Sequence, residues 1–305
     1  MVRFITRRLI VTIPMVLIVV SLTWGLIRLA PGNFYTGEKA IPAAIEQNLR
    51  ERYGLDKPWY VQYGKMIAGT LRGDFGLSLR YQGQPVNTIL RQAVPVSVTL
   101  GIAAYLIALA VGIVAGTYAA LYQNTKVDYT SMAIAMFGIS IPNFVLGPTL
   151  VLLFGLTWYI LPPARWEGFS RHLILPVLTL SAVYMAYIAR LTRSGMLEVL
   201  RSNYIRTARA KGLPERQILV RHAMRGGLLP VVSFSGPALA YLLTGTVVVE
   251  RIFALPGLGN YFINANLNRD EPLIIGIVAF ISIVVLIFNL LVDIAYGFID
   301  PRVRY

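Results

Sequence analysis

The sequence predicts an all-α polytopic membrane protein with six transmembrane helices. Three observations lead to this fold class. Of the 305 residues, 56% are hydrophobic and only 14% are charged, whereas soluble domains have about 45–50% apolar and about 25% charged residues. Six apolar stretches approach or exceed the roughly 20 residues that a membrane-spanning helix needs. The chain has no cysteine, which excludes disulfide scaffolds, thiolate metal sites and iron–sulfur clusters.

The first apolar stretch follows Arg3, Arg7 and Arg8. We interpret it as a retained helix, because its apolar run is longer than a signal-peptide core and residues 28–31 are a poor cleavage site. The fourth stretch is the shortest. The sixth contains one charged residue, Asp293, and the others contain none. The predicted spans are residues 9–27, 96–121, 132–160, 173–189, 228–249 and 273–299.

The basic loop, residues 190–225, sets the predicted orientation. It holds nine Lys and Arg residues against two Glu residues, which gives +7 of the chain's net charge of +14. Short basic loops stay in the cytoplasm, so we expect both termini to be cytoplasmic. The positive charge therefore reports membrane orientation, and no nucleic-acid partner is predicted.

Two regions are expected. Residues 1–95 comprise the first helix and an external loop subdomain, with an amphipathic helix at 42–53, a second helix at 59–71 and glycine turns near Gly73 and Gly83. Residues 96–305 comprise a membrane core of five helices and the basic loop.

No catalytic or metal site is predicted. The chain lacks a glycine-rich Walker loop, and neither of its two histidines has a partner at metal-ligand spacing. Asp293 is expected to pair with Arg190 or Arg193 near a membrane interface, with a role in ion relay as the alternative. A chain that moves a solute would therefore need another subunit to supply energy.

Small residues within the spans suggest close helix packing, and polar residues there suggest a path for a solute through the membrane. Gly112-x-x-x-Gly116 indicates close helix packing, with a moving seam as the alternative. Prolines kink the third and fifth spans. Polar side chains there could line a pore, or equally hydrogen-bond within and between helices; they are Ser140, Asn143, Ser181, Ser233, Ser235 and Thr244.

A short helix is predicted within the basic loop. Ser202 or Asn203 can cap it, and Gly212 and Pro214 end it. Such a helix is too short to be stable alone. Tyr204, Ile205 and Ala208 fall on one side as apolar anchors, which favours docking into a partner's groove over a loop that merely faces lipid.

The segment 207–214, with Arg221-His-Ala and Leu229-Pro230, resembles the cytoplasmic loop of ATP-binding-cassette importer permeases of the dipeptide/oligopeptide/nickel branch. Arg206 stands where the general motif of these permeases has Glu, and the Leu-Pro pair lies further on. The external loop is typical of the branch's B-type subunit. Further matching segments are 54–59, 73–78, 123–125, 250–259, 268–270 and 300–305.

The resemblance implies a type I importer permease (MetI-like) core in a bacterial inner membrane. It implies a second homologous permease subunit, two cytoplasmic ATPases that hold ATP and Mg, a periplasmic or extracellular peptide-binding protein, the lipid bilayer as surroundings and no cofactor on this chain. The coupling helix that docks to an ATPase would comprise Asn203, Tyr204, Ile205, Arg206, Thr207, Ala208, Arg209, Ala210, Lys211 and Gly212. A loop at the external mouth would comprise Glu250, Leu255, Pro256, Gly257 and Gly259.

Two alternatives stay open from the residues themselves: a self-sufficient ion-coupled carrier that uses Asp293, and a membrane receptor or scaffold. The exact solute also stays open among oligopeptides, dipeptides and other solutes such as metal chelates.

Overall fold

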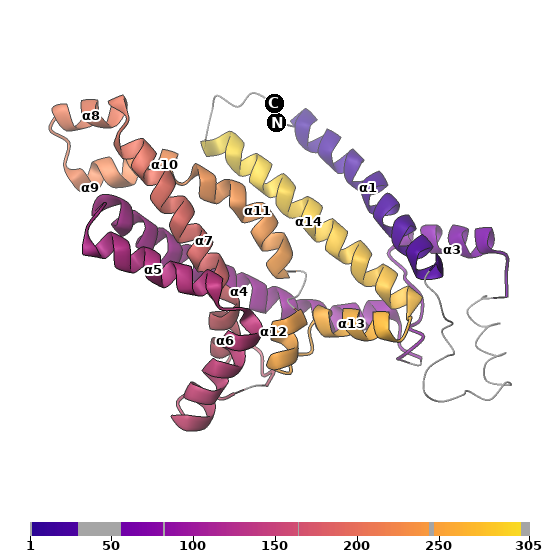
Figure 1. Ribbon diagram of the computed structural model, residues 1–305. Helices are drawn as coiled ribbons and strands as arrows, with labels where there is room; N and C mark the ends of the chain where they lie inside the picture. The colour runs from indigo at the N-terminus through magenta and orange to yellow at the C-terminus, as the bar shows by residue number, and fades with distance from the viewer. Residues whose placement is uncertain (1, 30–55, 82, 164, 244–246, 300–305) are drawn as a thin grey trace. The chain divides into compact units, whose positions relative to one another are not determined.

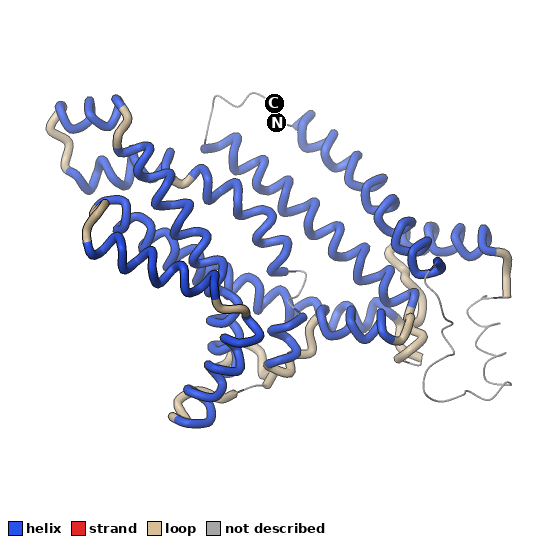
Figure 2. Tube along the Cα trace, viewed as in Figure 1, coloured by secondary structure: helices blue, strands red, loops and turns tan. Residues whose placement is uncertain are grey.

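The computed structural model describes residues 2–29, 56–81, 83–163, 165–243 and 247–299. These residues are largely helical, and among them the only strand-like pairing is one isolated bridge between Leu77 and Pro85 (Figure 1 and Figure 2). The predicted helix at 42–53, Thr244 and residues 300–305 lie outside the described residues. The elements are α1 (Val2–Leu29), α3 (Trp59–Arg72), α4 (Val86–Leu121), α5 (Lys126–Ser140), α6 (Asn143–Leu150), η1 (Val151–Thr157), η2 (Arg171–Leu173), α7 (Ile174–Leu200), α8 (Asn203–Ala210), α9 (Glu215–Gln217), η3 (Ile218–Ala223), α10 (Met224–Gly227), α11 (Leu229–Leu243), α12 (Val247–Ile252), α13 (Leu258–Leu267) and α14 (Glu271–Ile299).

Within the described residues, five helical stretches are long and apolar enough to cross a membrane: Ile10–Leu29, Val86–Leu121, Arg171–Leu200, Leu229–Ile252 and Glu271–Ile294. A sixth crossing exists if a bent pair of helices counts as one. The helix predicted at 59–71 is present as α3. Helix α7 extends beyond the predicted 173–189, so the first part of the basic loop continues this helix.

The third predicted span, 132–160, is not one continuous helix but a bent pair of helices, which together are long and apolar enough to cross a membrane. The segments Lys126–Ser140 and Asn143–Thr157 meet at an angle of 103°. Pro142 lacks an N–H and disfavours helical geometry in the residue before it. Ile141 accordingly has extended backbone angles, with φ −91° and ψ 114°. The proline therefore breaks the helix, whereas the sequence had suggested a kink.

The chain divides into two compact units. The first comprises Met1–Pro95 and Pro256–Leu286, and the second comprises Val96–Leu255 and Ile287–Tyr305. The division after Pro95 falls within the continuous helix α4, and the boundary between residues 95 and 96 stays a prediction. Residues 256–286, however, belong with the N-terminal unit, whereas the sequence assigned them to the membrane core.

A buried carboxylate explains why residues 256–286 join the first unit. Asp270 accepts hydrogen bonds from the Ser78 hydroxyl and from the backbone N–H groups of Leu79 (3.0 Å) and Arg80 (3.1 Å). It also accepts one from Leu273 N–H (3.3 Å) at the start of α14. Ser78 and Asp270 thus join two segments that the sequence singled out separately, 73–78 and 268–270.

The second unit is built on close packing between α4, α5 and α7. A Cβ atom added to Gly112 would lie 2.8 Å from Ile188, and one added to Gly116 would overlap the backbone oxygen of Ala189. On α5, a Cβ at Gly138 would lie 2.7 Å from the oxygen of Ala182. These glycines let backbones approach closely, so the Gly112-x-x-x-Gly116 pattern serves packing in this structure.

Candidate functional site

The helix predicted in the basic loop forms as α8 (Figure 1). It follows α7 after a short turn in which the Ser202 hydroxyl donates to the Val199 carbonyl oxygen at 2.6 Å. Ser202 occupies the N-cap position with extended angles, yet its side chain makes no cap bond to α8. Gly212 ends the helix at φ +75°, a left-handed conformation that glycine adopts without steric cost. Pro214 then stands at the N-cap position of α9.

The inner face of α8 is buried in its own chain. Ile205 is 0% exposed and Ala208 is 6% exposed. They pack in one cluster with Ala120 of α4, Met196 of α7, Ile218 and Ala223. Burying an isoleucine side chain contributes about 1.5–3 kcal/mol, which stabilises a helix too short to persist alone.

Two of the three residues expected to anchor a partner, Ile205 and Ala208, are therefore not available to one. This corrects the apolar docking predicted from the sequence. Tyr204, the third, is 49% exposed. The short helix finds the packing it requires within its own chain, because η3 folds back onto it.

The outer face of α8 is polar and carries positive charge. Eight of the ten predicted coupling residues are exposed: Asn203, Tyr204, Arg206, Thr207, Arg209, Ala210, Lys211 and Gly212. The Arg209 guanidinium donates to Glu215, with Nε 2.8 Å from Oε1, and this bond raises the pKa of Arg209. Among the described residues, no acidic side chain pairs with Arg206 or Lys211.

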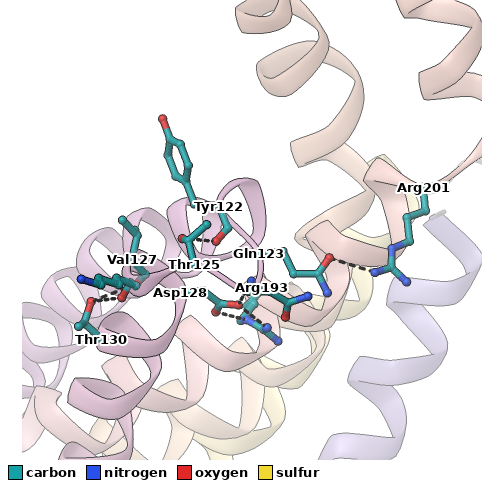
Figure 3. Close-up of polar contacts among 10 residues, drawn as sticks. Tyr122, Gln123, Thr125, Val127, Asp128, Thr130, Arg193 and Arg201 are labelled. Atoms are coloured by element: carbon teal, nitrogen blue, oxygen red, sulfur yellow. Dashed lines mark hydrogen bonds and ion pairs between the residues drawn. The ribbon is translucent and has the colours of Figure 1, made fainter.

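A partly buried ion pair holds α7 beside the turn between α4 and α5 (Figure 3). Arg193 donates through Nε to Asp128 Oδ1 at 2.6 Å and through Nη2 to Oδ2 at 2.7 Å. Asn124 N–H also donates to Asp128 Oδ2 at 3.0 Å. Nearer to α8, Arg201 Nη2 donates to Gln123 Oε1 at 3.0 Å. The helix that carries α8 is thus fastened to this turn at two points.

This ion pair was missed from the sequence. Asp293 was expected to pair with Arg190 or Arg193; because Arg193 pairs with Asp128 instead, the pairing with Arg190 is the part that stays a prediction. The signal was present: Asp128 is one of only 14 acidic residues, and it stands in the first turn of a helix. A bidentate arginine–carboxylate pair is the strong form of this interaction.

The segment predicted at the external mouth is mostly buried. Glu250 is 0% exposed and accepts a hydrogen bond from the Ser97 hydroxyl at 2.7 Å. Leu255, Gly257 and Gly259 are buried, and of the five predicted residues only Pro256 is exposed. The chain turns sharply at Ala254, which has φ +50°. Four of these five residues therefore pack within the chain and present no contact surface of their own.

The polar residues proposed for a pore bond mainly within their own helices. Each serine hydroxyl donates to a carbonyl oxygen three or four residues earlier: Ser140 to Met136, Ser181 to Leu178, Ser233 to Leu229 and Ser235 to Val231. Asn143 Oδ1 is buried and has no hydrogen-bond partner among the described residues. Ser235 also accepts a hydrogen bond from the Tyr105 hydroxyl of α4, and because such bonds form whether or not a side chain faces a pore, both interpretations of these residues stay predictions. Within the part of the chain that the structure describes, no group of three or more His, Asp or Glu side chains could hold a metal ion.

Comparison with known proteins finds relatives along the whole chain. The family described as binding-protein-dependent transport system inner membrane component matches residues 112–305, and the corresponding N-terminal family matches residues 1–101. The chain is 45% identical to the oligopeptide transport system permease protein OppB of Salmonella typhimurium, over 100% of both chains. It is 41% identical to the dipeptide transport system permease protein DppB of Bacillus subtilis, over 100% of this chain and 98% of the relative.

A solved structure is similar in fold. The MetNI methionine ABC transporter in inward-facing conformations aligns with a TM-score of 0.57 and 16% identity, over 72% of this chain and 100% of that chain. Together with the helical spans, this likeness confirms the predicted all-α polytopic membrane fold.

Proposed function

Because this chain belongs to the family of binding-protein-dependent transport system inner membrane components, we propose that it is the membrane-spanning permease subunit of an ATP-driven importer of peptides. The observation that carries the proposal is the full-length similarity to oligopeptide and dipeptide permease proteins. Oligopeptides and dipeptides are accordingly the substrates to test first.

The proposed assembly contains a second homologous permease subunit, two cytoplasmic ATPases and a peptide-binding protein on the other side of the membrane. ATP and Mg belong to the ATPases, because this sequence has no Walker loop. The basic loop faces the cytoplasm and both termini lie on that side, in accordance with the positive-inside rule.

In the proposed mechanism, α8 is the coupling helix. Closure of the ATPase dimer moves α8, and the buried contacts of Ile205 and Ala208 transmit that movement to α7. The Asp128–Arg193 pair extends the moving body to the turn between α4 and α5. Because α7 is long enough to span the membrane, displacement at one end changes the packing of the spans and thereby switches access to the pore.

Reconstitution of the complete complex in proteoliposomes tests this proposal. With the binding protein and a labelled tripeptide outside the vesicles and ATP on the ATPase side, we expect uptake that depends on ATP and on all components. A catalytically inactive ATPase serves as the control and should reduce uptake to background.

Two results would contradict the proposal in different ways. Peptide uptake by the isolated chain, abolished by Asp293→Asn, would favour an ion-coupled carrier. Peptide binding by a correctly assembled complex without any ATP-dependent uptake would favour a receptor.

A further inference from the structure

The outer face of α8 differs in chemistry from the apolar surface that the sequence suggested. We propose that this face binds the ATPase by charge, in a groove whose walls carry Asp or Glu side chains. The inference rests on the proposed function, since it concerns how the same helix recognises the ATPase.

The packing of α8 leaves one face for a partner. Ile205 and Ala208 are three positions apart, which places them on one side of the helix. With about 100° of rotation per residue, the opposite side carries Asn203, Thr207 and Ala210. These three are exposed and have short side chains, so a partner can approach the helix backbone closely.

Cationic side chains lie on both sides of this outer face of α8. Around the helix axis, Arg206 lies on one side of these outermost positions. Lys211, which directly follows the last residue of α8, lies on the other side. Arg209 differs from both, because Glu215 of this chain already accepts its hydrogen bonds at 2.8 and 3.4 Å. A groove that fits this surface would therefore carry an acidic side chain on each wall.

Neighbouring residues of the basic loop add positive charge close to this face. Arg216, Arg221 and Arg225 are also exposed in the basic loop, whose formal charge is +7. A surface of one sign accelerates association with a partner of the opposite sign and makes binding sensitive to salt. In this proposal Arg206 contacts the ATPase through its own positive charge, although the general motif of these permeases has Glu at this position.

The test measures binding of the purified ATPase to the permease complex in nanodiscs of uncharged phosphatidylcholine, at several salt concentrations. For the double variant Arg206→Glu/Lys211→Glu we expect Kd to rise by about 100-fold at low salt, as electrostatic pairs at interfaces can contribute strongly. The slope of log Kd against log salt should flatten. Arg206→Lys, which keeps the charge, should change Kd by less than about threefold.

Lys65→Glu provides the matched control, because Lys65 is an exposed cation on α3, outside the basic loop. The same charge reversal there should leave Kd unchanged. Reversing an acidic side chain in the ATPase groove to Arg should restore binding of the double variant.

The outcomes separate this inference from the proposed function. If the wild-type complex binds the ATPase but the double variant binds equally well, the charge-based inference is wrong while the proposed function stands. The same titrations are repeated in nanodiscs that contain anionic lipid. If the loss appears only there, the cations bind the membrane surface and the inference is again wrong. If the wild type binds no ATPase at all, the proposed function itself fails.

Discussion

Helix α8 and the segment 250–259 were both predicted to contact partner proteins, yet they differ in how far their residues are exposed. Eight of the ten residues predicted on α8 and its C-terminal end are exposed, against one of five in the other segment. The difference teaches that a family-typical motif can record either a contact surface or internal packing. Burial, which depends on the rest of the chain, decides between them.

The two regions also use charge differently. Along α8 the charges point outward, and among the residues that the structure describes only Arg209 has an acidic partner, Glu215. In the other segment the acidic charge is internal, because Glu250 is fully buried and accepts a hydrogen bond from the Ser97 hydroxyl, whereas its neighbour Arg251 is exposed. Substitutions in the two regions should therefore affect different properties, binding in the first and folding in the second, except where α8 itself faces inward.

The largest expected effect comes from placing a charge on the inner face of α8. Ala208→Glu buries a carboxylate without a partner and overfills the cluster, which should cost more than about 4 kcal/mol and unfold the loop. Ala210→Glu, on the outer face of the same helix, should change stability by less than about 0.5 kcal/mol. Thermal unfolding of the two purified variants compares them, and equal midpoints would contradict the two-faced helix.

The next effect concerns the ion pair beside the stem of the basic loop. Arg193→Met leaves Asp128, which is 1% exposed, without its guanidinium partner and should destabilise the chain by about 3–5 kcal/mol. The double variant Asp128→Leu/Arg193→Met removes both charges and should recover most of this loss. Denaturant titration of the wild type, the single variant and the double variant compares their free energies of unfolding. A double variant as unstable as Arg193→Met would show that the charge itself is not the cause.

In the 250–259 segment, Leu255→Ala should have a core-like effect. Leu255 is 0% exposed and packs in the largest cluster of the second unit, so its truncation should cost about 2–5 kcal/mol. The exposed neighbour Pro256 offers the comparison: Pro256→Ala should cost no more than about 1 kcal/mol. If Leu255→Ala instead weakened only binding of the peptide-binding protein, the segment would be a contact surface after all.

The smallest effect is expected at the ion pair on the surface of the basic loop. Arg209→Ala removes its bond to Glu215, and exposed pairs contribute only about 0.2–1 kcal/mol. The change in unfolding midpoint should shrink further in high salt, which screens exposed charges. A loss that persists undiminished at high salt would mean that Arg209 packs against the chain and does not act through its charge.

Much of the fold could be predicted because its signals are local. Long apolar runs identified the membrane class, and Ser202, Gly212 and Pro214 bounded a short helix that the structure places at Asn203–Ala210. The break at Pro142 was anticipated only as a kink. Proline determines that the helix is interrupted, but the angle of 103° between the two segments depends on what each segment packs against.

The sequence predicted where the short helix lies, but only partly which of its faces is exposed. Helix amphipathicity correctly placed Ile205 and Ala208 on one side, but it does not state whether that side meets a partner or the same chain. Helix η3 and Met196 of α7 supply the answer by covering it.

By itself, the sequence determined the membrane class, the concentration of positive charge in one loop and the limits of α8, since each depends on neighbours along the chain. Only the tertiary structure decided which face of α8 is outside and which buried acids have which partners. Asp128 meets Arg193 across 65 positions, and Asp270 meets Ser78 across 192. Such pairs form because folding brings distant segments into contact, and no local pattern specifies which segments these will be.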